Sequence, residues 1–152
     1  MNEAATIATK KALEQMVRTL FRAENGIGSR AIGDDLSAPR DSPEETRRIA
    51  DGILASDYLP IIRGKGQVDV DRNETLAKIS SGPAQFVRLV ATADIEVCLF
   101  LDNQVAVVRS ALPTVDSRTS PPTEATYRNT HVFLCRSGEW KCVAWQVTKV
   151  QD

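Results

Sequence analysis

The stretch YRNTHVFLCRSGEWKCVAWQVTKV, residues 127–150, alternates apolar and polar side chains on both sides of a short break at residues 136–138. Such alternation is typical of two half-buried antiparallel strands joined by a tight turn. The first strand carries His131, the only histidine of the chain, two positions after Asn129. Residues two apart share a strand face, so this hairpin places polar groups among side chains that would otherwise form an apolar face.

The turn geometry determines which residues face each other across the hairpin. A bulged loop with a left-handed Gly138 pairs Cys135 with Glu139 and puts His131 opposite Val143, whereas a two-residue turn puts His131 opposite Ala144. We favour the bulged register because it collects apolar side chains on the His131 face, as a ligand pocket requires. That face holds Tyr127, Phe133, Val143, Trp145 and Val147. The other face suits a dimer interface; it holds Arg128, Thr130, Val132, Leu134, Trp140, Cys142, Ala144 and Gln146.

The rest of the C-terminal half is also predicted to be strand. Residues 85–101 are long for one straight strand, so we expect a bend near Thr92–Asp94. A turn at Asp102–Asn103 leads back into the strand 104–115, and a polar loop with two prolines connects it to the hairpin.

The N-terminal half is predicted to be helical. Apolar residues recur at helical spacing between Glu3 and about Ala23, which indicates an amphipathic helix. Ser42 and Asp71 each suit an N-cap with a glutamate three positions on, so two further helices are expected after them. Helices followed by an antiparallel sheet make an α+β fold.

Composition limits the possible functions. The chain of 152 residues fits a single domain, 1–152, and its net charge of −1 argues against nucleic-acid binding. No apolar run indicates a membrane span or a secretory signal. Three cysteines without CxxC spacing favour reduced thiols in a cytoplasmic setting and no metal site, and we expect no cofactor. Residues 24–41, with Asp34–Asp35, are predicted to be a flexible solvated loop.

The order of these elements resembles the nuclear transport factor 2-like superfamily, and within it the SnoaL-like proteins and the calcium/calmodulin kinase association domain. The resemblance covers nearly the whole chain outside residues 24–41. It rests on ASDYL (55–59), DRNETLAKI (71–79), VAVVRS (105–110) and NTHVFLCRSGEWKCVAWQVT (129–148). It implies a cone in which a curved sheet wraps a long helix, with a small-molecule pocket at the mouth and a homodimer interface on the outer sheet face.

The resemblance also implies site residues. In the kinase association domain, two basic residues on neighbouring strands can bind a small carboxylate in the pocket, and the matching motifs transfer these roles to Arg109 and His131. Tyr127, Asn129 and Trp145 would complete the ligand contacts.

Two features qualify this site. Val147 stands where a third basic residue would fall, so the ligand can be a carboxylate or an apolar molecule. Arg109 has a structural alternative, an ion pair with Glu96, and His131 has another as a core residue.

Three functions follow as hypotheses. The first is a dimeric small-molecule-binding domain of the SnoaL-like type. The second is an acid–base enzyme similar to ketosteroid isomerase (an isomerase, cyclase or dehydratase) with His131 and Asp57 as catalytic candidates. Its relatives carry a carboxylate base just after the second helix, where this chain has Ile61, Ile62 and Arg63. The third is an assembly module that dimerises through the outer face.

Overall fold

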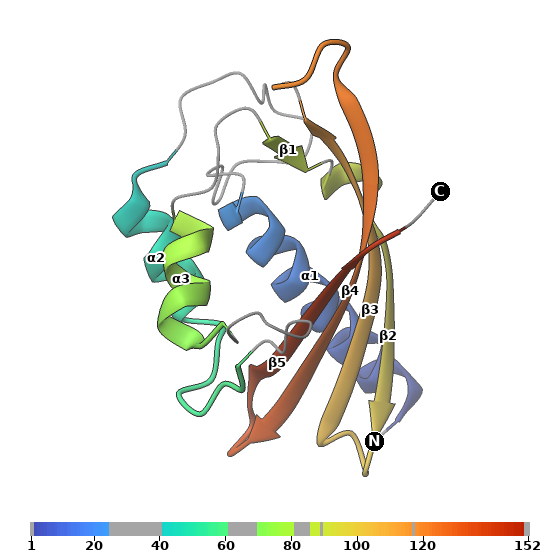
Figure 1. The fold of residues 1–152 in the computed structure, drawn as a ribbon. Coiled ribbons are helices and arrows are strands. Elements are labelled where there is room, and N and C mark those ends of the chain that lie inside the picture. The colour runs from blue at the N-terminus through green and yellow to red at the C-terminus, as the bar shows by residue number, and fades with distance from the viewer. Residues whose placement is uncertain are drawn as a thin grey trace.

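The computed structural model describes residues 2–24, 41–60, 70–80, 86–88, 90–116 and 118–150, and it confirms the α+β prediction (Figure 1). Three helices come first: α1 (Glu3–Glu24), α2 (Pro43–Asp51) and α3 (Arg72–Ser80). The strands are β1 (Phe86–Arg88), β2 (Asp94–Phe100), β3 (Val105–Asp116), β4 (Thr123–Arg136) and β5 (Glu139–Lys149), with a 3₁₀ turn η1 (Val90–Thr92). The predicted loop at 24–41, including Asp34–Asp35, lies almost entirely outside the described residues, as do residues 61–69.

All strands form one antiparallel sheet in the order β1-β3-β4-β5, and β2 pairs with β3 on the same side as β1. The long segment 85–101 is therefore broken as expected, because η1 separates two short strands that share one neighbour. Arg18 of α1 stabilises this break by donating to the carbonyl oxygens of Val90 at 2.7 Å and Ala93 at 3.3 Å.

Both predicted helix caps are present. The Ser42 hydroxyl accepts a hydrogen bond from the Glu45 amide at 3.2 Å, and the Asp71 carboxylate accepts one from the Glu74 amide at 2.8 Å. Each bond satisfies an amide that the first helical turn leaves without a partner. Local sequence was therefore sufficient to locate where α2 and α3 begin.

Helix α1 lies between the sheet and the pair α2 and α3 (Figure 1). Its predicted apolar stripe is fully buried at Leu13, Val17, Leu20 and Phe21. The core thus fills both sides of α1. We call the sheet side that faces α1 the inner face and the opposite side the outer face.

The hairpin register differs from the one predicted. A two-residue turn at Ser137 (φ 52) and Gly138 (φ 77) pairs Arg136 with Glu139, and a bulge then shifts the ladder between Val132 and Phe133. His131 consequently lies opposite Trp145, not opposite Val143 or Ala144. Both expected registers fail because the extra residue is in β5 and not in the turn.

The bulge also corrects the face assignment of β5. Cys142 was expected on the outer face but is fully buried, opposite Phe133. Its backbone pairs with the segment after α2: the Ala55 amide donates to the Cys142 carbonyl at 2.8 Å, and the Cys142 amide donates to the Ile53 carbonyl at 2.9 Å. Trp140, also expected outside, packs against the buried core.

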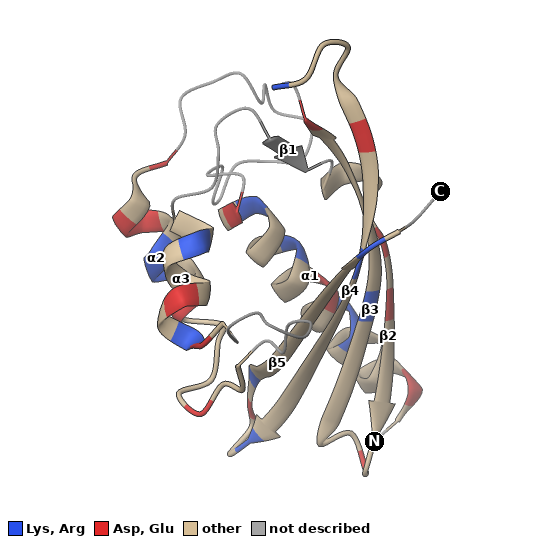
Figure 2. Cartoon of the chain, in the orientation of Figure 1, with Lys and Arg blue, Asp and Glu red and all other residues tan. Residues whose placement is uncertain are grey.

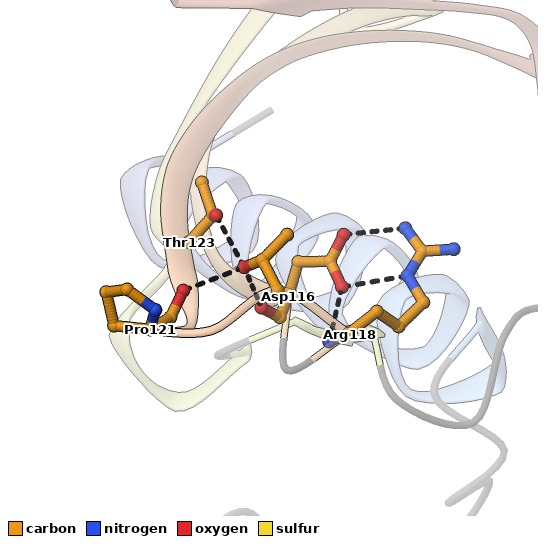
Figure 3. A network of polar contacts seen from close by, with 5 residues as sticks. Asp116, Arg118, Pro121 and Thr123 are labelled. Carbon is orange, nitrogen blue, oxygen red and sulfur yellow. Dashed lines mark hydrogen bonds and ion pairs between the residues drawn. The ribbon is translucent and has the colours of Figure 1, made fainter.

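The connection between β3 and β4 is held by a compact polar network (Figure 3). The Asp116 carboxylate accepts two hydrogen bonds from the Arg118 guanidinium, at 2.8 and 2.6 Å, and these lower the pKa of Asp116 to about 2. The Thr119 hydroxyl lies 2.6 Å from that of Thr123 and donates to the Pro121 carbonyl at 2.9 Å. These bonds join the ends of the two longest strands.

Candidate functional site

His131 lies on the inner face, as predicted, and is completely buried. Its ring stacks on Trp145 with centroids 4.7 Å apart and meets the edge of Phe21 from α1 at 5.7 Å. Phe133, two residues along β4, lies 6.4 Å away. Aromatic rings from α1, β4 and β5 therefore surround the imidazole.

Neither ring nitrogen of His131 has a hydrogen-bond partner. Burial lowers the pKa of His131 to about 3, so the ring is neutral at ordinary pH and offers one donor and one acceptor. Buried polar groups in native proteins are almost always satisfied, by protein, water or ligand. Two unsatisfied nitrogens on one side chain mark a place where a water molecule or a ligand would supply hydrogen bonds.

Further polar groups lie beside His131 on the inner face. The Trp145 indole donates a buried hydrogen bond to the Asn129 side-chain oxygen at 2.9 Å, and the Asn129 amide donates to the Tyr127 carbonyl at 3.4 Å. Ser110 pairs with Asn129 across β3 and β4, and its buried hydroxyl has no partner. We call Ser110, Asn129, His131 and Trp145 the inner polar cluster.

Ser110 was not among the predicted site residues, although it directly follows Arg109. Strand alternation places Ala106, Val108 and Ser110 on one face, but only the register of β3 against β4 shows that this face is the buried one. Tyr127, which was predicted, lies two residues before Asn129 and is half-buried.

Arg109 lies on the outer face, and the structure does not bring it together with His131. It pairs with Thr130 on β4 and with Glu96 on β2, and its guanidinium donates to the Glu96 carboxylate at 2.7 Å. That hydrogen bond is the main cause of the lowered pKa of Glu96. The predicted ion-pair alternative is thus present, and the physical reason is register: Val108, not Arg109, faces His131.

Asp57 does not join the cluster either. It is exposed, and its carboxylate accepts a hydrogen bond from the Arg136 guanidinium at 2.8 Å, at the turn end of β4. This bond lowers the pKa of Asp57 and keeps the carboxylate ionised. The ion pair between Asp57 and Arg136 therefore links the segment after α2 to the β4–β5 hairpin.

The outer side of the sheet carries two hollows. The polar one, of about 270 Å³, is lined by Asp94, Glu96, Arg109, Ser110, Ala111, Arg128, Asn129 and Thr130. The apolar one, of about 390 Å³, is lined by Leu59, Pro60, Thr130, Val132, Ala144, Trp145 and Gln146. Ser110 and Asn129 of the inner polar cluster line the polar hollow, and Trp145 lines the apolar one.

No family model matches the sequence, and no curated protein matches it. Solved structures do match. The CaMKII hub of S. rosetta is 13% identical with a TM-score of 0.65, covering 93% of this chain and 96% of that one. An NTF-2 like protein of unknown function from Silicibacter pomeroyi is 13% identical with a TM-score of 0.60, covering 99% and 100%. A ketosteroid isomerase-like protein from Erwinia carotovora atroseptica is 16% identical with a TM-score of 0.57, covering 91% and 94%.

The chain therefore has the nuclear transport factor 2-like fold that its sequence resembled. At these identities the likeness concerns the fold alone, because this fold carries unrelated functions. In the described part of the chain, no helix is long and apolar enough to cross a bilayer. The same residues contain no group of three or more side chains that could hold a metal ion.

Proposed function

We propose that this chain is a SnoaL-like small-molecule-binding domain whose ligand sits between the sheet and the helices at the inner polar cluster. The observation that best supports this proposal is that His131 is fully buried with both ring nitrogens unsatisfied. An apolar side chain of similar shape would avoid the free-energy cost of burying two unsatisfied nitrogens. The imidazole at this position is therefore best explained by a contact made when a ligand is bound.

The surroundings favour an uncharged and largely apolar ligand. Phe21, Phe133 and Trp145 offer aromatic surface, while neutral His131 and Ser110 offer hydrogen bonds at one place. Arg109, the cation expected to bind a carboxylate, lies outside and is paired with Glu96. A ring compound with one hydroxyl or carbonyl group matches this lining better than a small carboxylate does.

The ketosteroid-isomerase-like alternative has less support. A general acid or base works best with a pKa near the operating pH, whereas burial holds His131 at about 3. The only other candidate, Asp57, is at the surface in an ion pair with Arg136. Binding is therefore the better interpretation of this site.

Assembly is a second candidate function, compatible with the first. In the described residues, all three helices lie on the inner side of the sheet, so the outer face of β2–β5 has no helix against it (Figure 1). Val107, Val132 and Leu134 form an apolar area on that face. We propose that the chain is a homodimer through this surface, in a reducing compartment such as the cytoplasm, consistent with its three free cysteines.

The test is a thermal-shift screen with steroids and aromatic ketones, each matched with a carboxylate of similar size. A ligand at one hundred times its Kd stabilises the folded protein by about 2.7 kcal/mol, which is readily measured as a rise in Tm. His131→Phe is the informative variant because it keeps a ring in place and removes both nitrogens. Arg109→Ala is the control on the other face.

We expect neutral ring compounds to raise the Tm of the wild type and of Arg109→Ala, but not that of His131→Phe. The variant should itself be as stable as the wild type or more stable. A ligand whose effect survives in His131→Phe would contradict this site. Loss of the effect in Arg109→Ala alone would favour a carboxylate site on the outer face instead.

A further inference from the structure

The outer face is divided along the strand direction into an apolar half and a charged half. Near the β2–β3 turn, the cross-strand row Cys98–Val107–Val132–Ala144 is uncharged, and the row next to the turn, Phe100–Val105–Leu134–Lys141, carries one charge at its β5 end. Farther along the strands come the rows Glu96–Arg109–Thr130–Gln146 and Asp94–Ala111–Arg128–Thr148. Figure 2 shows the same division: an uncharged stretch of β3 and β4 lies between the turn end of the sheet and the charged positions of β2 and β3.

Two opposite charges in the last row have no partner among the described residues. Asp94 and Arg128 flank Ala111 from β2 and β4, and both side chains are exposed. Neither makes a hydrogen bond or ion pair in the described part of the chain. Arg109, by contrast, is already neutralised by Glu96 at 2.7 Å. The polar hollow of about 270 Å³ thus has a free carboxylate on one side of the small Ala111 side chain and a free guanidinium on the other.

We propose that the occupant of this hollow is a second copy of the chain, with Arg128 of each copy paired to Asp94 of the other. A two-fold axis parallel to β3 and lying between the two outer faces exchanges the β2 side with the β4 side. Asp94 on β2 of each copy then lies over Arg128 on β4 of the other. The ion pair forms at two equivalent positions, as a self-complementary interface requires.

The same axis also matches the apolar half. It moves nothing along the strand direction, so Val107 and Val132 of one copy face the corresponding row of the other. An axis perpendicular to the strands that passes between the two halves would instead place the apolar half on the charged half and bury Asp94 and Arg128 without partners, which is strongly unfavourable. Nearly aligned strands are also a common geometry for two packed sheets.

This inference rests on the proposed dimer and adds the pairing that orients it. The experiment is a sedimentation-velocity concentration series on the wild type, Arg128→Asp, Asp94→Arg and the double variant Arg128→Asp/Asp94→Arg. Arg47→Asp is the matched control, because Arg47 is an exposed arginine on the helix side. Melting curves of each variant verify that the monomer remains folded.

We expect the wild type to form a dimer, and we expect Arg47→Asp to dimerise with the same Kd. Each single reversal puts like charges together at two places and should raise the dimer Kd about tenfold or more. The double variant restores opposite charges and should return to within about threefold of the wild type.

The outcomes separate the levels of the proposal. A wild-type dimer that both single reversals leave unchanged would overturn the Arg128–Asp94 pairing while the dimer stands. A double variant no tighter than the single ones would also overturn the pairing. A wild type that stays monomeric at all concentrations would overturn the interface itself, and ligand binding at His131 would remain to be judged by the thermal-shift screen.

Discussion

His131 is the residue in which stability and proposed function conflict most directly. Burying an imidazole between Phe21 and Trp145 without a hydrogen bond is unfavourable, and proteins tolerate such groups mainly at functional sites. The free energy lost in the unliganded protein can be regained when a ligand supplies the missing bonds. The residue therefore predicts a measurable stability difference even before any ligand is known.

Acid should destabilise the wild type through this residue. Its pKa is about 3 in the folded protein and about 6.5 when exposed, so the unfolded chain takes up the proton first as the pH falls. Stability is unaffected above about pH 6.5 and falls between there and pH 3, by about 2 kcal/mol at pH 5. Urea unfolding of the wild type and His131→Phe at pH 7 and pH 5 measures this. Equal losses in both proteins would refute it.

At the scale of elements, the β4–β5 hairpin controls which side chains enter the core. Its two-residue turn and the bulge at Val143 together bring Trp145 opposite His131. The turn requires left-handed backbone at Ser137 and Gly138, and a glycine adopts this conformation without steric cost.

Gly138→Ala should cost about 1 kcal/mol of unfolding free energy, because a Cβ is disfavoured at φ 77 although no atom lies within 4 Å of it. Gly52→Ala, at the end of α2 with φ −70, is the matched control. It should be neutral or stabilise by up to about 1 kcal/mol, since alanine restricts the unfolded chain. Urea unfolding of both variants checks the difference, and equal effects would show that the Gly138 turn is not strained by a side chain.

At the scale of the whole molecule, the sheet, α1 and the α2–α3 pair share one core. The segment after α2 returns to pair with β5, so Cys142 has strand neighbours on both sides. Its thiol is fully buried, and burial raises its pKa to about 12. Access to this thiol therefore requires the core to open.

In a Cys98→Ser/Cys135→Ser variant, labelling of Cys142 by a disulfide reagent should be about a thousandfold slower than in the urea-unfolded chain. A Cys142→Ser variant, which keeps the two half-buried thiols, should label much faster. Rapid labelling of Cys142 under native conditions would show that the segment after α2 detaches from β5 without global unfolding.

Local sequence was sufficient for everything that depends on neighbours along the chain. The stripe of α1, the caps Ser42 and Asp71 and the break after β1 all follow from spacing and residue type. The grouping of His131 with Asn129 and Phe133 belongs here too, because the alternation of β4 alone places the three on one face.

Only the tertiary structure decided what depends on how strands are aligned. Arg109 lies outside because β3 pairs Val108, its neighbour, with His131, and no residue type reveals that offset. Cys142 lies inside because a bulge in β5 shifts one side of the ladder by a residue. Side chains alternate with a period of two, so a shift of one position exchanges core for surface, and the energy that selects the register comes from packing between distant segments.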